Sequence, residues 1–406
     1  MHRVAITGIG IISCLGNDSE TVGEALRKGK SGIVIDENRI KLGFRSPLTG
    51  MIRGFDADKY LSKKHRKTMP DFAIHALAAV MDALRMSGLD QSDIQNENTG
   101  LIFGCDSSCV AAVEQVELLR KHKETKSIGS GLIFRSMTST ITMNLNTILK
   151  TKGASWTISS ACSSGGHAIG QAAGLIALGQ QDRVICGGAQ EISWESMCSF
   201  DGLGAFSIRT DNPESASRPF DIDRDGLVPS GGAAAIVLEQ YNLAVKRGAK
   251  VLGEIMGYAF SSDGSNLSVP SQDGLSRAMT AALKNADINP HDIDYICAHA
   301  TSTPAGDSVE ADNILSVFGE NTPWVSSLKS MTGHELWMSG ASQVVYSVIM
   351  GLQGFIAPNI NFEKPDKNSE RLKIVDKTIV DPPRKILCNS AGFGGTNACI
   401  IIRNES

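Results

Sequence analysis

The sequence predicts an α/β fold made of two packed halves, and three observations support this. Short apolar runs alternate with stretches in which apolar residues recur at helical spacing, a pattern typical of strands joined by helices in a partly parallel sheet. The chain has 406 residues, more than one compact domain usually takes. The pattern starts again near residue 250, and no low-complexity linker interrupts it. We therefore expect an N-terminal half, residues 1–250, packed against a C-terminal half, residues 251–406.

The expected elements follow from the period of the apolar residues and from the turn-forming residues between them. In the first half, strands are expected at 4–12, 100–104, 155–159, 183–187 and 233–238, and helices at 19–27, 72–86 and 162–178. In the second half, strands are expected at 251–258, 293–298, 325–327, 387–390 and 398–403, and helices at 275–286, 307–318 and 343–353. The last two strands would form a hairpin around a glycine-rich loop.

Composition narrows the class of protein. The chain is 42% hydrophobic and its formal net charge is -4, which is ordinary for a globular protein and unlike the basic balance of nucleic-acid binders. No apolar stretch is long enough to span a bilayer, and the first apolar run is too short for a signal peptide. Nine scattered cysteines without a CxxC pair indicate neither a zinc site nor a disulfide framework. We expect a cytoplasmic protein with no metal and no nucleic-acid or membrane partner.

Cys162 is the first candidate for chemistry, because an expected strand there meets a tight turn and a helix of small residues. Unpaired N–H groups and the positive dipole end at a helix start favour an anion, so we expect a lowered thiol pKa. The N–H of Cys162 would also face a developing oxyanion. A single cysteine is more often a small buried hydrophobe, but the strand–turn–helix context favours a nucleophile.

Three further loops follow expected strands in the second half. His299 leaves a strand into a loop rich in hydroxyl groups, and the carboxyl end of a strand is where α/β proteins place active sites. Lys329 and His334 flank a second turn, and Phe393 lies among three glycines in a third. Each feature taken singly also has a simpler interpretation. His299 could be a loop histidine bonded to neighbouring hydroxyl groups, Lys329 a solvated lysine, and the turn at Phe393 a plain hairpin turn.

Together the four segments resemble the elongating β-ketoacyl–acyl carrier protein synthases, most closely the synthase I branch. The matching stretches are SSACSSGGHAIG, AHATSTPAGD, KSMTGH and GFGGTN, with further likeness in VAITGIGIIS, GGAQEISWE, FDGLGAFS, SRPFDIDRDG, VFGE and GFIAPNIN. The likeness runs nearly end to end. It implies a thiolase-type fold with five layers, α-β-α-β-α, and a dimer with one active site per subunit. The pair of histidines argues against two related groups, the chain-initiating synthases with their Cys-His-Asn pattern and the thiolases.

The resemblance also implies a decarboxylative Claisen condensation and roles for individual residues. Cys162 would carry the acyl chain as a thioester, and His299 and His334 would stabilise the enolate of malonyl–carrier protein. The N–H groups of Cys162 and Phe393 would hold the oxyanion. Lys329 would order the histidines, with support from Glu310, Thr301 and Thr303. No cofactor is implied, because the substrates arrive on the phosphopantetheine of acyl carrier protein.

Two other groups of residues are interpreted more simply. His167 lies on the helix after Cys162 and is expected to be a structural core residue. The basic stretches would ordinarily be solvated, but carrier proteins of this kind are acidic. Four lysines are therefore docking candidates by electrostatic steering: Lys63, Lys64, Lys67 and Lys126.

The sequence departs from the family after the second histidine. The family has small residues there, but this chain has Glu335 and Trp337, and Ala391 stands where a phenylalanine is common. With Phe200, these are the candidates for a reshaped substrate pocket. We hypothesise a specialised system, for example one making aryl polyenes, in which a catalytic subunit pairs with a chain-length-factor-like homologue in place of a homodimer. A non-catalytic, tunnel-shaping subunit is the alternative from another class, and the intact Cys162 argues against it.

Overall fold

The computed structural model describes residues 1–405, apart from the side chains of Lys63 and Lys64. Within these residues one mixed sheet contains eleven strands in the order β11-β10-β9-β12-β13-β8-β1-β7-β6-β4-β5. Its strands in the first half are β1 (Val4–Ile12), β4 (Thr99–Gly104), β5 (Ser155–Ile158), β6 (Arg183–Gln190) and β7 (Gly232–Gln240). Those in the second half are β8 (Gly253–Ser262), β9 (Tyr295–Cys297), β10 (Trp324–Ser326), β11 (Lys373–Ile374), β12 (Lys385–Gly392) and β13 (Thr396–Asn404). A separate small sheet pairs β2 (Ile33–Ile35) with β3 (Leu48–Gly50).

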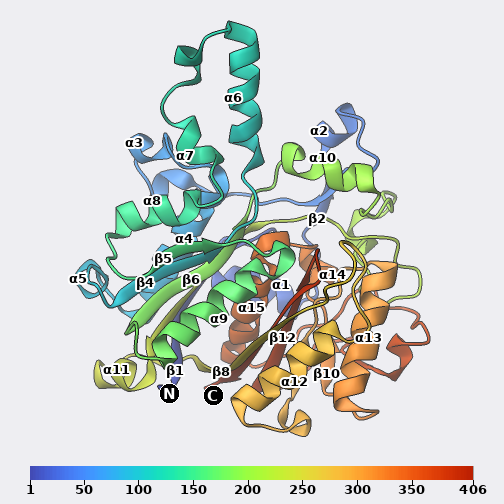
Figure 1. Cartoon of the computed structure of the whole chain (residues 1–406). Coiled ribbons are helices and arrows are strands. Elements are labelled where there is room, and N and C mark those ends of the chain that lie inside the picture. Colours follow the sequence, from blue (N-terminus) through green and yellow to red (C-terminus); the bar gives the residue numbers. More distant parts are fainter. Residues whose placement is uncertain (406) are drawn as a thin grey trace.

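The helices connect these strands and cover their faces (Figure 1). The longer ones are α1 (Ser19–Arg27), α4 (Asp71–Ser87), α6 (Cys109–His122), α8 (Thr140–Leu149), α9 (Ser164–Ala177), α10 (Trp194–Leu203), α12 (Gly274–Ala286), α13 (Pro304–Phe318) and α15 (Ser339–Gln353). The shorter ones are α2 (Glu37–Lys41), α3 (Lys63–Arg66), α5 (Gln91–Ile94), α7 (Leu132–Ser136), α11 (Tyr241–Lys246) and α14 (Lys329–Thr332). No helix in the described part of the chain has the length and apolar character needed to cross a membrane.

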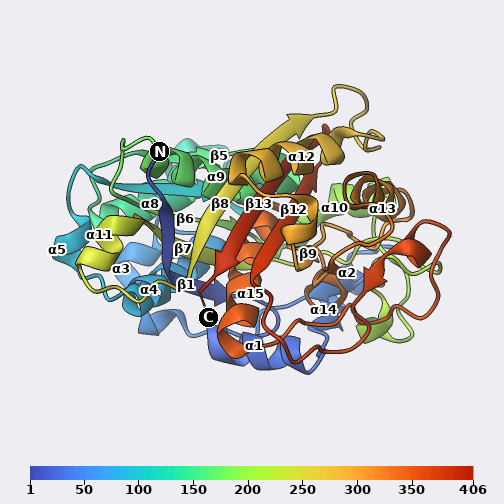
Figure 2. The ribbon, with the colours of Figure 1, turned by 90° about the horizontal axis from the view of Figure 1, so that it is seen from below.

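The strand pairing repeats between the two halves. In the first half β4 is parallel to β5 and β6, while β7 is antiparallel to both β6 and β1. In the second half β9 is parallel to β10 and β12, while β13 is antiparallel to both β12 and β8. The two sets join where the first residues of β1 pair with β8, and Figure 2 shows β8, β13 and β12 side by side. The sheet is therefore mixed, and the division near residue 250, between α11 and β8, stays a prediction.

Three apolar clusters define the layers. The largest packs α9 and α15 between the strands of the two halves, and it includes Ile169 and Val345. A second cluster packs α4 and α8 on the other face of the first set of strands, and a third packs α12 and α13 on the other face of the second set. Helices therefore lie between the two sets of strands and on both outer faces, which is the five-layered α-β-α-β-α arrangement. Burial on both faces explains why the central strands are continuous apolar runs.

The expected elements lie within a few residues of those observed, and the differences are mostly omissions. The excursion containing α6, α7 and α8 had no expected helix, and α6 projects from the body of the molecule (Figure 1). Only Ala111 of α6 is buried, so this helix lacks the apolar stripe from which helices are predicted. This excursion lies between β4 and β5, at the edge of the sheet near the candidate nucleophile.

Candidate functional site

Cys162 lies at the turn between β5 and α9. The chain ends β5 at Ile158, forms a 3-10 turn over Ala161–Ser163 and then enters α9. Ala161 has φ 45°, a left-handed conformation that is strained for alanine, and its N–H donates to Asp106 Oδ2 at 3.2 Å. Behind the turn, a Cβ on Gly104 would lie 2.4 Å from the backbone of Ser164, so only glycine allows α9 to approach β4 this closely. The turn places the thiol at the start of the helix, as the sequence predicts.

The prediction that the Cys162 thiol has a lowered pKa is wrong. Burial raises the pKa of Cys162 to about 12, although the charge of Lys329 and the N–H of Phe393 act in the opposite direction. Cys162 is only 5% exposed, and removing the thiolate from water outweighs what the turn provides. The resting group is therefore a thiol, and a nearby base is needed to activate it.

His334 is the group placed to do this. Its Nε2 lies 3.1 Å from Cys162 Sγ, and its Nδ1 lies 3.0 Å from Ser339 Oγ. The backbone is fixed on both sides, because the His334 N–H donates to Val228 O and the Ser230 N–H donates to His334 O. Burial, and then the charge of Lys329, hold the pKa of His334 well below its usual range. The imidazole is therefore neutral.

His299 faces His334 across the same space. It follows β9, and the two ring centroids are 5.2 Å apart with the planes nearly perpendicular, at 86°. Burial, Lys329 and His334 hold the pKa of His299 well below its usual range, so this ring is also neutral. Its Nδ1 has no hydrogen-bond partner among the described residues. Each neutral imidazole has one N–H that can donate to the oxygen of a bound carbonyl group and one lone pair that can accept a proton.

Glu310 and Lys329 lie behind the histidines. The Glu310 carboxylate accepts from the N–H groups of His299 at 2.9 Å and Ala300 at 2.6 Å, and from Asn389 Nδ2 at 3.0 Å. Lys329 is 3% exposed, and its Nζ has no hydrogen-bond partner among the described residues. Its charge lowers the pKa of Cys162 and of both histidines. Glu310 therefore fixes the His299 backbone, while Lys329 supplies positive potential.

Phe393 is the last candidate residue near Cys162, and it lies in the turn of the β12–β13 hairpin. Its backbone N–H lowers the pKa of the Cys162 thiol and so favours the thiolate. The two residues after it, Gly394 and Gly395, have φ of 79° and 72°, a region that favours glycine. The Gly394 N–H donates to Leu267 O at 2.8 Å, which joins this turn to the loop after β8.

These groups, except Lys329, border one cavity of about 460 Å³. Its walls include Cys162, His299, His334, Thr301, Thr303, Phe200, Ala391 and Phe393. Glu335 and Trp337 are not part of this lining. The Trp337 indole packs behind Phe200, with centroids 6.3 Å apart, and donates to Ser107 Oγ at 3.0 Å. Of the four pocket candidates, two therefore line the cavity and two do not.

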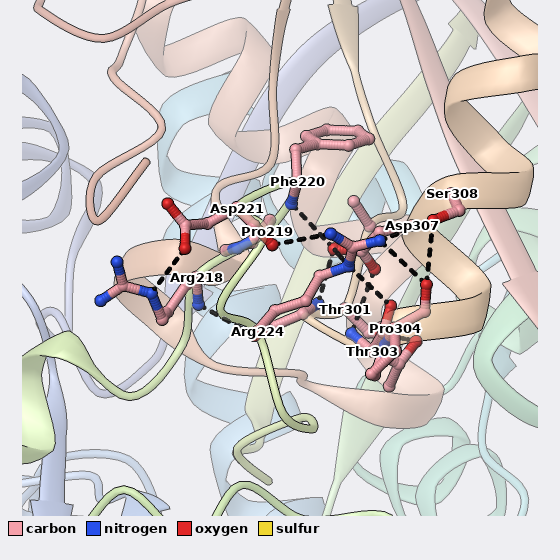
Figure 3. A network of polar contacts seen from close by, with 12 residues as sticks. Arg218, Pro219, Phe220, Asp221, Arg224, Thr301, Thr303, Pro304, Asp307 and Ser308 are labelled. Carbon is pink, nitrogen blue, oxygen red and sulfur yellow. Dashed lines mark hydrogen bonds and ion pairs between the residues drawn. The ribbon is translucent and has the colours of Figure 1, made fainter. Parts of the chain in front are cut away.

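A buried network that sequence reasoning missed holds the cavity loop at Thr301–Pro304 (Figure 3). Arg224 donates to the carbonyl oxygens of Thr303 and Pro304 and to Asp366 Oδ2, at 3.1, 2.9 and 2.7 Å. The Asp307 carboxylate accepts from the N–H groups of Ser302 and Phe220, which both have left-handed φ, 70° and 67°. The charges in SRPFDIDRDG were the available signal, but only the fold shows which loop they reach.

Comparison with known proteins agrees with this geometry. The model "Beta-ketoacyl synthase, N-terminal domain" matches residues 1–244, and "Beta-ketoacyl synthase, C-terminal domain" matches residues 252–363. This chain belongs to the β-ketoacyl synthase family. The synthase is 39% identical to 3-oxoacyl-[acyl-carrier-protein] synthase 1 of Haemophilus influenzae and 38% identical to that of Escherichia coli strain K12, with 99% of each chain covered.

Solved structures confirm the thiolase-like fold of the synthase. A β-ketoacyl synthase from Burkholderia phymatum matches with a TM-score of 0.95 at 32% identity, and the ishigamide ketosynthase/chain length factor matches with 0.93 at 28%. A ketosynthase in complex with its type II polyketide acyl-carrier protein matches with 0.88 at 28%. Each comparison covers 100% of both chains.

Of the remaining candidates of the synthase, Lys67, Lys126 and His167 do not line the cavity. Lys67 and Lys126 are exposed, while the side chains of Lys63 and Lys64 lie outside the described residues. His167 on α9 is half-buried, with its Nδ1 2.7 Å from the Tyr258 hydroxyl, and it does not line the cavity.

Glu335 gives the synthase a testable pH dependence. Its carboxylate accepts from Ser342 Oγ and the Tyr346 hydroxyl, and burial raises its pKa from 4.5 to about 7. The folded chain thus binds this proton more tightly than the unfolded chain, so its stabilising contribution is fully present below pH 4.5 and is lost as the pH rises through 7. The free energy of unfolding of the wild type, relative to Glu335→Gln, should fall by about 1–3 kcal/mol from pH ~5 to ~8. Urea titrations at several pH values measure this difference, and a constant or rising difference would contradict it.

Proposed function

We propose that the synthase is a 3-oxoacyl-[acyl-carrier-protein] synthase that condenses a Cys162-bound acyl chain with malonyl–carrier protein. One observation carries the proposal: a buried thiol and two neutral imidazoles border the same cavity, with His334 Nε2 3.1 Å from the sulfur. The relatives' names and the family membership support this reaction class. The enzyme would need no resident cofactor, because both substrates arrive as thioesters of the carrier's phosphopantetheine.

The first half-reaction is acyl transfer. His334 Nε2 accepts the Cys162 thiol proton as the sulfur attacks the acyl carbonyl carbon. The N–H groups of Cys162 and Phe393 stabilise the oxyanion, and the carbon–sulfur bond to the carrier breaks. The departing thiolate takes the proton from His334, so the acyl group moves to Cys162 with no net change in protons.

The second half-reaction is condensation. The bond between the malonyl α-carbon and its carboxylate breaks, CO₂ leaves, and its electron pair forms an enolate whose oxygen accepts hydrogen bonds from His299 and His334. The α-carbon attacks the Cys162 thioester carbonyl and forms the new carbon–carbon bond. The tetrahedral intermediate then expels the Cys162 thiolate, which takes one proton from solvent. Lys329 favours the negative charge throughout.

Mass spectrometry tests this proposal directly. Incubation with an acyl–carrier protein should add the mass of one acyl group, and peptide mapping should place it on Cys162 and on none of the other eight cysteines. Addition of malonyl–carrier protein should then release CO₂ and return the free thiol. Absence of an adduct would favour a non-catalytic, tunnel-shaping subunit.

Elongation of a specialised acyl chain is the second candidate function, and the aromatic rings around Phe200 favour it. The Phe200 ring is stacked against Phe206, at 6.2 Å and 11°, and against Phe393, at 5.9 Å and 21°. Flat rings in this arrangement suit a flat conjugated acyl chain better than a flexible saturated one. Competition between saturated and polyenoyl carrier thioesters of equal length decides this, and preference for the saturated chain would reject it.

A second subunit would cover the β5 edge of the sheet. Among the described residues β5 pairs only with β4, so its outer edge has unpaired backbone groups. α8 packs on β5, and α7 packs on α8. Exposed apolar side chains lie on β5, on α7 and directly after α7: Trp156, Ile133, Phe134 and Met137. We infer a dimer across this edge, with either a second copy or a chain-length-factor-like homologue like the one in the ishigamide pair. Native mass spectrometry of the purified chain distinguishes the homodimer from a monomer that awaits a different partner.

Lys67 and Lys126 would help an acidic carrier protein to dock, because both are exposed cations. Charge reversal at both positions should raise KM for the acyl–carrier protein and weaken its dependence on salt, without changing the rate at saturation.

A further inference from the structure

Ser339 is the residue that contacts the far side of the His334 ring. It is the first residue of α15, is fully buried, and its Oγ lies 3.0 Å from His334 Nδ1. The opposite ring nitrogen, Nε2, lies 3.1 Å from Cys162 Sγ. The imidazole is thus held between one hydroxyl group and one thiol.

We propose that Ser339 is a positioning residue that allows His334 to adopt each of its two neutral tautomers in turn during one catalytic cycle. The inference rests on the proposed function. It concerns this chain's own arrangement around the second histidine, where the sequence departs from the small residues of the family.

The argument depends on what a hydroxyl group can do. Serine Oγ can donate one hydrogen bond and accept two, whereas a backbone N–H can only donate and a carbonyl oxygen can only accept. When Ser339 accepts from Nδ1–H, Nε2 has a free lone pair that accepts the Cys162 S–H. When Ser339 donates to Nδ1, the proton is on Nε2, which then donates. A fixed backbone partner would impose one tautomer, but this hydroxyl satisfies both.

The two half-reactions require different tautomers. Acyl transfer needs a lone pair on Nε2 to take the thiol proton, and condensation needs a proton on Nε2 to stabilise the enolate oxygen. Between them Nε2 gains a proton from water in the cavity while Nδ1 loses one, so the total number of protons on the ring is unchanged. The low pKa of His334 keeps the ring neutral at the end of each step.

Removal of the hydroxyl should affect the half-reactions unequally. In Ser339→Ala, a proton on Nδ1 would be a buried donor without an acceptor, which costs more than a bare lone pair. The Nε2–H tautomer then dominates. Acylation of Cys162 should become about 10-fold slower, which corresponds to roughly one lost hydrogen bond. Condensation from pre-acylated enzyme should change by less than about 2-fold by the same argument.

The matched control is Ser342→Ala. Ser342 is also buried on α15, but its Oγ donates to Glu335 and to Ser339 O and does not contact His334. It should leave the ratio of the two rates unchanged. Ser339→Thr retains a hydroxyl and should restore fast acylation. Equal slowing of both half-reactions in Ser339→Ala, or no slowing of acylation, would overturn the proposal.

A measurement on the wild type avoids the question of whether variants fold. In protein labelled with ¹⁵N-histidine, the His334 signals, assigned by comparison with His334→Ala, should show the proton on Nδ1 in the free enzyme and on Nε2 in the acyl-enzyme. The same tautomer in both states would overturn the inference while leaving the proposed function intact. Failure of Cys162 to become acylated would instead contradict the proposed function.

Discussion

Alanine in place of His334 should slow both half-reactions, whereas alanine in place of His299 should slow only condensation. Loss of one preorganised donor to a developing oxyanion typically lowers the rate about 10²–10³-fold, so each variant should lose that factor in condensation. Of the two histidines, only His334 is within hydrogen-bond distance of the nucleophile, with its Nε2 3.1 Å from Cys162 Sγ. Among the described residues no hydrogen bond joins the His299 ring to Cys162. Because burial raises the thiol pKa to about 12, acylation cannot proceed at its normal rate without that base.

The two steps can be measured separately. Intact-protein mass spectrometry after rapid mixing with acyl–carrier protein gives the acylation rate, and product analysis after malonyl–carrier protein is added to pre-acylated enzyme gives the condensation rate. Cys162→Ala should form no acyl-enzyme. His167→Ala is the control. This histidine lies on α9, the helix that follows Cys162, but its Nδ1 is bonded to the Tyr258 hydroxyl and it does not line the cavity. Acylation slowed equally by the His299 and His334 variants would contradict the assignment of the base.

Arg224→Met should destabilise the fold strongly. Removing one partner of a buried ion pair leaves an uncompensated charge and typically costs about 3–5 kcal/mol. The Arg224 side chain is 4% exposed, lies 3.8 Å from Asp307 Oδ2 and 2.7 Å from Asp366 Oδ2, and also satisfies two carbonyl oxygens of the cavity loop. Methionine fills similar volume but removes one donor from each of these acceptors and the countercharge from both carboxylates. The free energy of unfolding in urea should fall by that amount.

Arg277→Met provides the comparison. Arg277 pairs with Asp273 one helical turn away, and both side chains are about half exposed or more. Such surface pairs contribute roughly 0–1 kcal/mol, so this variant should be nearly as stable as the wild type. Similar losses in the two variants would show that the network in Figure 3 does not hold the loop at Thr301–Pro304.

Much of the fold is encoded locally. Strands that are buried on both faces, such as β1 and β7, are continuous apolar runs, so their positions are predicted from sequence alone. The exposed helix α6 and the short α7 bury little apolar surface, so no period marks them, and tertiary context decides them. The strand order also needs three dimensions, because parallel strands pair across intervening helices.

The site divides in the same way. The candidate residues are predicted from local sequence, because Cys162, His299, His334 and Phe393 each follow an expected strand or lie at a glycine turn. Their protonation and their neighbours depend on the folded arrangement. Burial raises the pKa of Cys162, whereas the sequence predicts a lowered value. The folded chain also leaves Glu335 and Trp337 out of the cavity lining and places Ser339 Oγ beside His334 Nδ1. Local sequence sets backbone turns, but solvent exclusion and long-range contacts set protonation and side-chain partners.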